Sequence, residues 1–218
     1  MSREGYVLLG DIVSSKKIKD RAQFQEKLIR ACNFINKHHK NEIIAKMKII
    51  KGSDEIGCLL KNLAPLYNII KEIGEILYPV KIRFVLVKGI IDTGFLTNDI
   101  SRMDGPAFHR ASELMNDLKK EKLILNISTS NNLGDALISN NINLIYLVKG
   151  RWSPTKREII EAYERWGDQR KVASKLKITQ QTVSYHLKSS NWKQIKKIEI
   201  KLNRSLKVMG TESNESGT

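Results

Sequence analysis

Residues 44–60, IAKMKIIKGSDEIGCLL, decide the fold of the first part of the chain. Two short apolar stretches, Ile44–Ile50 and Ile56–Leu60, flank a polar connection over Lys51–Glu55. Glycine and serine in this connection favour a turn, and apolar runs of this length favour strands. The pattern therefore predicts a β-hairpin.

Further strands and helices are predicted on both sides of the hairpin. Periodicity and turn residues predict strand Tyr6–Ile12, helix Asp20–Lys40, helix Asn62–Leu77 capped by Asn62, strand Lys81–Asp92, helix Gly105–Lys120 and strand Leu123–Ser128. This order contains the β-α-β-β-α-β pattern of a ferredoxin-like sheet with helices on one face. We expect an α+β domain over residues 1–149.

Composition limits the class of protein. The chain has 218 residues, and a hydrophobic fraction of 41% is enough for a core. Two cysteines and four histidines form neither a disulfide framework nor a zinc pattern. No stretch has the length of a membrane span or the layout of a signal peptide, so we expect a cytoplasmic protein without a membrane partner.

The net charge of +15 is concentrated near the end of the chain. Residues 150–209 contain 15 Lys and Arg against five Asp and Glu, whereas residues 1–149 contain 23 against 16. Such a basic block either meets a polyanion or is solvated, and composition leaves both open. The polar tail, residues 210–218, is predicted to be disordered.

Three carboxylates are expected to meet at one end of the sheet. Asp11 ends the first strand, and Asp54 and Glu55 lie in the hairpin turn. The first and third strands are neighbours in a ferredoxin-like sheet. Two carboxylates 4 Å apart repel by about 4 kcal/mol at an effective dielectric constant of about 20, which favours a cation between them. We predict that Asp11 and Asp54 bind Mg²⁺ or Mn²⁺, which would in turn bind a triphosphate. The alternative is that these residues are ordinary turn and cap residues.

Four segments in this region resemble a known family. YVLLGDIVSSKKIKDR, KGSDEIGCLL, YPVKIRFVLVKGIIDTG and DGPAFHRASELM resemble, in order and spacing, the bacterial SatD family. The region is similar at greater distance to class III nucleotide cyclases and GGDEF diguanylate cyclases. This resemblance implies a palm domain with Asp11 and Asp54 as metal ligands and Glu55 at the second acidic position of the GGDEF signature, where it is a candidate catalytic residue.

The sequence departs from the cyclase pattern in ways that bear on catalysis. Ser53 replaces the second glycine of the signature and Ile56 replaces its phenylalanine. No residues that read a purine or stabilise a transition state are identified. Arg102, His109 and Arg110 are expected to be solvated or packed. We therefore expect the domain to bind a nucleotide at most weakly and to form no cyclic product.

The basic end is predicted to contain three short helices, Thr155–Trp166, Gln169–Leu176 and Gln180–Lys188. The turn between the second and third helices is Lys177–Thr179, in which Thr179 caps the next helix. This layout predicts a helix-turn-helix over residues 150–209. A small helical bundle with a solvated basic face is the alternative.

Residues 170–190, RKVASKLKITQQTVSYHLKSS, resemble the helix-turn-helix of sigma-factor and LuxR-type regulators. The resemblance implies that the segment TQQTVSYHL is a recognition helix whose side chains read double-stranded DNA. Its base-facing and capping residues would be Thr179, Gln180, Gln181, Thr182, Ser184 and Tyr185, and the phosphates would meet Lys171, Lys175, Lys177 and Lys188. Lys177 stands where such turns often have glycine.

Two uses of the last helix, Asn191–Met209, stay open: packing on the preceding helices, and formation of a homodimer. Taken together, the sequence favours a sequence-specific DNA-binding regulator whose first domain senses a nucleotide or a metal. The rival interpretations are a metal-dependent enzyme acting on nucleoside triphosphates, resembling a nucleotide cyclase, and an adaptor with neither activity.

Overall fold

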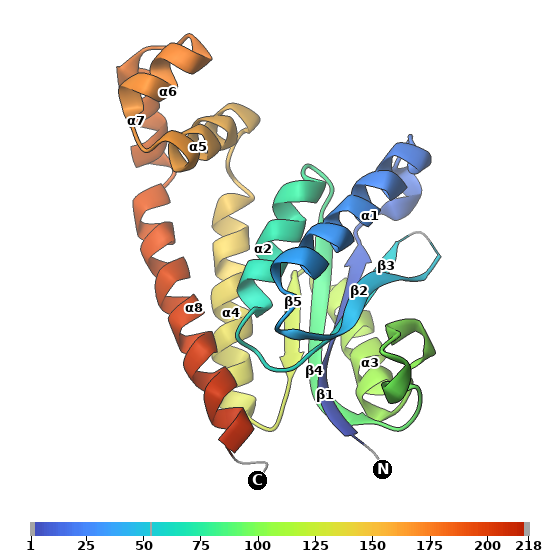
Figure 1. Ribbon diagram of the computed structural model, residues 1–218. Helices are drawn as coiled ribbons and strands as arrows, with labels where there is room; N and C mark the ends of the chain where they lie inside the picture. Colours follow the sequence, from blue (N-terminus) through green and yellow to red (C-terminus); the bar gives the residue numbers. More distant parts are fainter. Residues whose placement is uncertain (1–2, 53, 216–218) are drawn as a thin grey trace. The chain divides into compact units, whose positions relative to one another are not determined.

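The computed structural model describes residues 3–52 and 54–215, and the chain forms two compact units (Figure 1). One unit contains residues 1–143 and 203–218, and the other contains residues 144–202. The division falls inside helices α4 (Asn132–Lys149) and α8 (Trp192–Glu215), whereas the sequence predicted a domain boundary between residues 149 and 150.

The first unit is built on a five-stranded mixed sheet with the strand order β2-β3-β1-β4-β5. The strands are β1 (Arg3–Ile12), β2 (Ile43–Lys51), β3 (Glu55–Leu60), β4 (Ile82–Ile91) and β5 (Leu125–Ser128). β1 is antiparallel to β3 and to β4, and β5 is parallel to β4. The α+β class, the β2–β3 hairpin and the predicted pairing of the first and third strands are confirmed.

Helices cover both faces of the sheet, which corrects the expectation of a single covered face. α3 (Pro106–Glu121) packs on the face to which Val7 and Leu9 point. α1 (Arg21–His38) and α2 (Leu66–Leu77) contact each other on the opposite side of the sheet (Figure 1). The physical reason is that β1 has buried residues on both of its faces, so that each face needs a cover.

Helix α2 begins later than its sequence pattern predicted. The Asn62 side chain accepts a hydrogen bond from the Ala64 N–H at 3.0 Å, which stabilises a local turn in place of a helix cap. Pro65 then directly precedes the first helical residue, Leu66. By contrast, the Asp20 side chain caps α1 by accepting a hydrogen bond from the Gln23 N–H at 2.9 Å.

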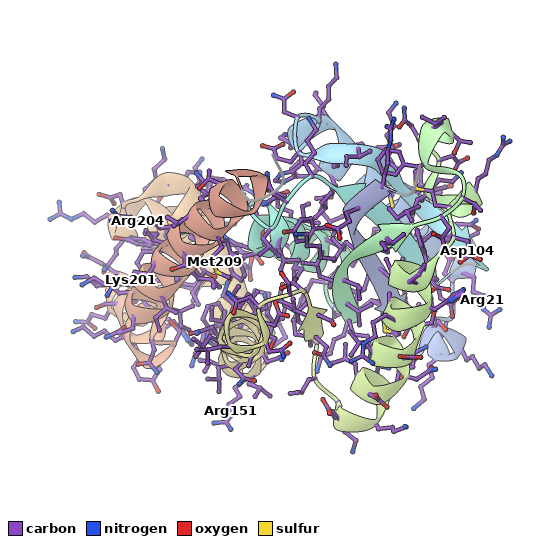
Figure 2. The ribbon with its side chains drawn as sticks, turned by 90° about the horizontal axis from the view of Figure 1, so that it is seen from below. Arg21, Asp104, Arg151, Lys201, Arg204 and Met209 are labelled. Carbon is purple, nitrogen blue, oxygen red and sulfur yellow. The ribbon has the colours of Figure 1, made fainter. Side chains whose placement is uncertain are left out.

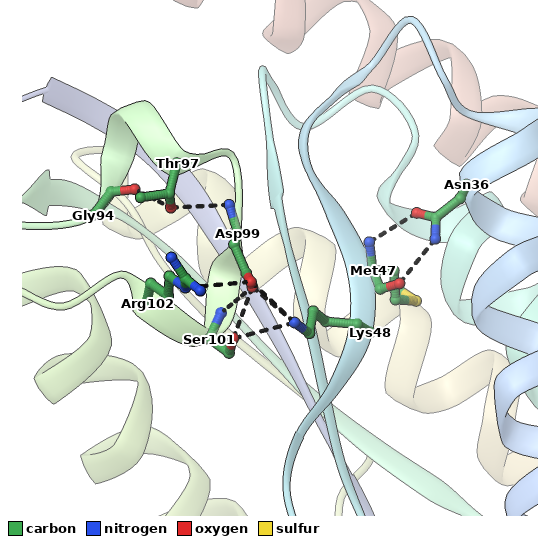
Figure 3. A network of polar contacts seen from close by, with 8 residues as sticks. All are labelled: Asn36, Met47, Lys48, Gly94, Thr97, Asp99, Ser101 and Arg102. Atoms are coloured by element: carbon green, nitrogen blue, oxygen red, sulfur yellow. Dashed lines mark hydrogen bonds and ion pairs between the residues drawn. The ribbon is translucent and has the colours of Figure 1, made fainter.

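A polar network fastens the edge strand β2 to its neighbours (Figure 3). On one side, the Asn36 side chain of α1 donates to the Met47 carbonyl at 2.8 Å and accepts from the Met47 N–H at 2.7 Å. On the other side, Lys48 Nζ donates to both oxygens of Asp99, at 2.9 and 3.1 Å. Asp99 begins the short helix η3 (Ile100–Arg102), which follows η2 (Phe95–Thr97).

The second unit contains α5 (Pro154–Trp166), α6 (Gln169–Leu176) and α7 (Gln180–Ser189). Their bounds agree with the predicted helices to within one residue. These three helices enclose a core of their own, made of Ile159, Ile160, Ala162, Val172, Ala173, Val183 and Leu187.

Two features of the helices α4 and α8 differ from expectation. α4 is not among the elements predicted from periodicity, because apolar residues lie on its exposed side as well as on its buried side. α8 continues through Glu215 and buries Gly210, although this polar segment was expected to be disordered. Within residues 3–52 and 54–215, no helix is both long enough and apolar enough to cross a membrane.

Candidate functional site

The backbone brings the three predicted acidic residues to one end of the sheet. Asp11 of β1 lies directly opposite Glu55 of β3 in the antiparallel register. The main-chain carbonyl of Asp54 accepts a hydrogen bond from the Ile12 N–H at 2.9 Å, so the hairpin turn is anchored beside the end of β1. Directly opposed residues point to the same face, so the side chains of Asp11 and Glu55 share one face of the sheet.

The side chain of Asp11 faces two cations of the chain itself. Lys119 Nζ of α3 lies 2.8 Å from Asp11 Oδ1, and Arg83 Nη1 of β4 lies 3.7 Å from Asp11 Oδ2. The exposed fraction of the Asp11 side chain is 17%, which limits the screening of these charges by water. Arg83 is the partner of Asp11 in the β1–β4 register, and its Nε is buried.

Asp54 has a different partner. Its Oδ2 accepts a hydrogen bond from Ser15 Oγ at 2.8 Å, which ties the hairpin turn to the segment that follows β1. A metal ion held by Asp11 and Asp54 would have to share Asp11 with Lys119 and Arg83. Among the described side chains, no group of three or more His, Cys, Asp or Glu is arranged to hold a metal ion. Metal binding at this place stays a prediction, and Ser53 of the turn lies outside the described residues.

The other polar candidates of the first unit are exposed. Arg102 lies 3.9 Å from Asp99, and Arg110 lies 3.0 Å from Glu113 on the same helix. His109 Nε2 lies 3.3 Å from Asp104 Oδ1, and its side chain is 72% exposed. These contacts are local surface pairs, as the sequence led us to expect.

The second unit holds the predicted DNA-binding residues on α6, α7 and the turn between them. Asp168 caps α6 by accepting a hydrogen bond from the Lys171 N–H at 2.8 Å. Lys177 adopts a left-handed conformation with φ 55°, so a lysine occupies the backbone region that glycine favours. Thr179 then caps α7 by accepting a hydrogen bond from the Thr182 N–H at 3.1 Å, as predicted.

The exposed side of α7 carries a polar stripe. Gln181, Tyr185 and Lys188 are exposed and follow one another at spacings of four and three residues, which places them on one side of the helix. Val183 and Leu187 on the opposite side are buried in the core of the unit. Gln180 is also exposed, and Ser184 is half-buried. We call Gln181, Tyr185 and Lys188 the α7 stripe.

Thr179 and Thr182 have a capping role. Their hydroxyl groups lie 2.9 Å apart and bond each other, in addition to the cap on the Thr182 N–H. Both hydroxyl groups are therefore already engaged in hydrogen bonds at the N-terminus of α7. This leaves Gln180 and the α7 stripe as the polar groups best placed to meet a ligand.

Exposed basic side chains occur on α6, in the turn that follows it and on α8. Lys171, Lys175 and Lys177 are exposed on α6 and in the turn. Lys201 and Arg204 of α8 are exposed as well, and Figure 2 shows both side chains projecting away from their helix. The cations that the sequence assigned to the phosphate backbone are thus all accessible to solvent.

Sequence reasoning missed Arg83, Lys119 and Ser15, which contact the acidic residues. A partial signal was available for Arg83, because it is a charged residue that interrupts the apolar run at the start of β4. Lys119 lies more than a hundred residues from Asp11 in the chain, and no local pattern links the two.

Comparison with known proteins gives one family and a distant structural similarity. A model described as the SatD family matches residues 6–202. A bacterial light-regulated adenylyl cyclase is 15% identical, with a TM-score of 0.42, and the match covers 58% of this chain and 43% of that one. A guanylyl cyclase is 11% identical, with a TM-score of 0.36, over 54% of this chain and 71% of that one. No curated protein matches the chain.

These findings bear on the two resemblances that the sequence suggested. The similarity to the SatD family is confirmed. The resemblance of residues 170–190 to sigma-factor and LuxR-type regulators gains no support from the comparisons and stays a prediction. Because the matching model spans residues 6–202, most of the chain and all of α5, α6 and α7, the protein belongs to the SatD family.

Proposed function

We propose that the unit of residues 144–202 binds duplex DNA through α7 and that the chain acts as a sequence-specific DNA-binding regulator. The observation that carries the proposal is the α7 stripe: three exposed polar side chains on a helix whose other side is held in a core. A helix that reads the major groove needs such a rigid support and such an exposed row.

The chemistry of the stripe fits this role. Gln181 has the donor and acceptor pair that forms two hydrogen bonds with adenine. Lys188, with Lys171, Lys175 and Lys177 nearby in sequence, supplies the positive charge that phosphates attract. The excess of ten positive charges over residues 150–209 acts in the same direction.

The proposal is tested by fluorescence anisotropy with the full chain and a duplex selected from a random pool, over a series of salt concentrations. We expect Lys188→Ala to weaken binding to all duplexes and to reduce the log–log salt slope by about one, because one phosphate contact is lost. We expect Gln181→Ala mainly to reduce discrimination between sequences, by about 1 to 3 kcal/mol for a contacted base pair. Lys40→Ala, at an exposed lysine of the other unit, is the matched control.

Two outcomes would reject DNA binding by α7. The first is a folded protein without affinity for DNA at low salt. The second is an effect of Lys188→Ala no larger than that of Lys40→Ala, which would assign the affinity to general positive charge.

A second candidate function is metal-dependent chemistry on a nucleoside triphosphate at Asp11, Asp54 and Glu55. The β1–β3 register and the hydrogen bond from Ile12 to Asp54 favour it, because they bring three acidic residues to one end of the sheet. Mg²⁺ or Mn²⁺ would supply Lewis-acid chemistry there, with Asp11 and Asp54 as its ligands. Lys119 and Arg83 compete with the ion for Asp11.

This competition gives the test. Lys119→Met should raise the affinity for Mn²⁺ about two- to five-fold in calorimetry, which corresponds to the loss of one partly exposed ion pair. Asp11→Asn should abolish the effect. The regulator proposal predicts no cyclic product from ATP or GTP with Mn²⁺, whereas a product that disappears in Asp54→Ala would establish the second candidate.

A further inference from the structure

The part of α8 that belongs to the second unit carries positive charge that no acidic side chain on its surface balances. Within residues 192–202 the helix has one acidic residue, Glu199, and four lysines: Lys193, Lys196, Lys197 and Lys201. Glu199 is buried and pairs with Lys149 Nζ of α4. Its charge is therefore neutralised inside the unit and is not available to the lysines on the surface.

Contacts with α5 fix this part of α8 to the core of the second unit. Trp192 Nε1 donates a hydrogen bond to Glu164 Oε1 at 3.0 Å, and Lys196 Nζ lies 3.0 Å from the same oxygen. The rings of Tyr163 and Trp192 meet edge to face, with their centres 5.1 Å apart. The start of α8 is thus held in place, and Lys196 is already paired.

The other three lysines form a row on the exposed side of the helix. Lys193, Lys197 and Lys201 are exposed and follow one another at spacings of four residues, which places them on one side of α8, about 6 Å apart along its axis. In the part of the chain that the structure describes, none of the three has a carboxylate within ion-pair distance. Figure 2 shows Lys201 projecting away from its helix. We call these three residues the α8 lysine row.

The α8 lysine row is unfavourable for the free helix. Like charges four residues apart on a helix repel each other, so the pairs Lys193–Lys197 and Lys197–Lys201 both destabilise it. An anion bound along the row removes this repulsion. The arrangement therefore favours a ligand that carries several negative charges in a line.

The surrounding surface favours the phosphates of nucleic acid over a lipid surface. A helix that lies on a membrane inserts a continuous apolar face. Ile198 and Ile200 are 43% and 61% exposed, but residues two positions apart lie about 200° apart around a helix. Ile195 and Leu202 are buried. Residues 192–202 therefore present no continuous apolar face to a lipid surface.

We propose that the α8 lysine row binds the phosphate backbone of duplex DNA without reading its sequence. Three cations in a line suit a polymer of evenly spaced negative charges, and each contact releases condensed counterions into the solvent. This inference rests on the DNA binding proposed for the second unit, but it does not depend on base reading by α7. The row supplies affinity that is the same for every sequence.

The first experiment measures fluorescence anisotropy with the full chain and labelled duplexes of arbitrary sequence over a series of salt concentrations. We expect Lys193→Gln/Lys197→Gln to weaken binding to all duplexes equally and to reduce the log–log salt slope by about two, because two phosphate contacts are lost. Lys37→Gln/Lys40→Gln, at two exposed lysines of the other unit, removes the same net charge and is the matched control. It should leave the slope unchanged.

The second experiment separates binding from folding through Lys197→Glu. This substitution turns two repulsions along the row into attractions, so thermal unfolding of the free protein, followed by circular dichroism, should shift upward by about 2 °C. The same variant should bind duplex DNA about ten-fold more weakly at low salt, because a phosphate contact is replaced by repulsion. A variant that is more stable and yet binds less well cannot owe its weaker binding to a damaged fold.

Three outcomes would overturn the proposal. One is a salt slope for Lys193→Gln/Lys197→Gln equal to that of the control pair while Lys188→Ala still reduces it, which would leave DNA binding by α7 intact. Another is an unfolding midpoint for Lys197→Glu no higher than that of wild type. The third is equally strong, row-dependent binding to phosphatidylglycerol vesicles or to polyglutamate. If instead the row variants act as expected while Gln181→Ala and Lys188→Ala have no effect, the row is established and base reading by α7 is rejected.

Discussion

The carboxylate of Asp99 holds together the irregular connection between β4 and α3. It accepts hydrogen bonds from Lys48 of β2 and from the Ser101 N–H and hydroxyl, at 2.7–3.1 Å (Figure 3). The hydrogen bond from Lys48 is the main cause that lowers the pKa of Asp99 to about 2, with Ser101 adding to the effect. The ionised carboxylate is therefore a structural part of the connection between β4 and α3.

The lowered pKa predicts how stability depends on pH. The pKa of Asp99 lies below the unfolded value of about 3.9, so its contribution to stability is present above about pH 4 and is lost as the pH falls toward 2. Asp99→Asn should be less stable than wild type at pH 7, and the difference should shrink over that acidic range. Urea unfolding at a series of pH values measures it. The control is Asp92→Asn, at an exposed aspartate near the start of the same connection, and an equal convergence in this variant would contradict the assignment to Asp99.

At the scale of elements, α7 depends on the cap at its N-terminus. The helix has ten residues, and an isolated helix of that length is unstable in water. Its first turn is held by Thr179, which accepts from the Thr182 N–H and bonds the Thr182 hydroxyl. Its other side is held by Val183 and Leu187 in the core. The position of the α7 stripe thus rests on one local cap and two buried side chains.

Thr179→Ala tests the cap. The substitution removes the acceptor for the Thr182 N–H, and we expect it to lower the free energy of unfolding by about 1 kcal/mol. Thr179→Ser keeps the hydroxyl and should recover most of the loss. Chemical denaturation of the full chain measures both variants, and equal losses in the two would show that the threonine methyl group, rather than the cap, is responsible.

At the scale of the whole molecule, each of the two units contains a buried apolar cluster of its own. One joins β1 and β4 to α3, and the other joins α5, α6 and α7. Because each unit encloses its own apolar side chains, damage to one core is expected to stay within that unit.

Val183→Ala tests the independence of the cores. Val183 is fully buried, and its truncation should cost about 2 kcal/mol of local stability. Hydrogen exchange followed by mass spectrometry should show faster exchange over residues 155–190 and unchanged protection in β1 and β4. Faster exchange in the strands as well would show that the units unfold together.

The sequence by itself determined the local elements of this protein. The sequence predicted the hairpin around residues 51–55, the three helices after residue 153 and the cap at Thr179. The caps at Asp20 and Asp168 could have been predicted in the same way. Each of these features depends on residues only a few positions apart. The same locality explains why the three acidic residues could be expected at one sheet end once the strand order was inferred.

Only the tertiary structure decided which elements pack against one another and which distant side chains come into contact. It placed helices on both faces of the sheet, brought Lys119 to Asp11, and buried Ile138 and Ile142 of α4 while leaving Leu133 and Leu137 exposed. Such contacts join residues far apart in the chain, and they depend on sheet register and on packing rather than on periodicity. A local pattern shows that a helix has two apolar sides, but only the packed fold shows which side is already covered.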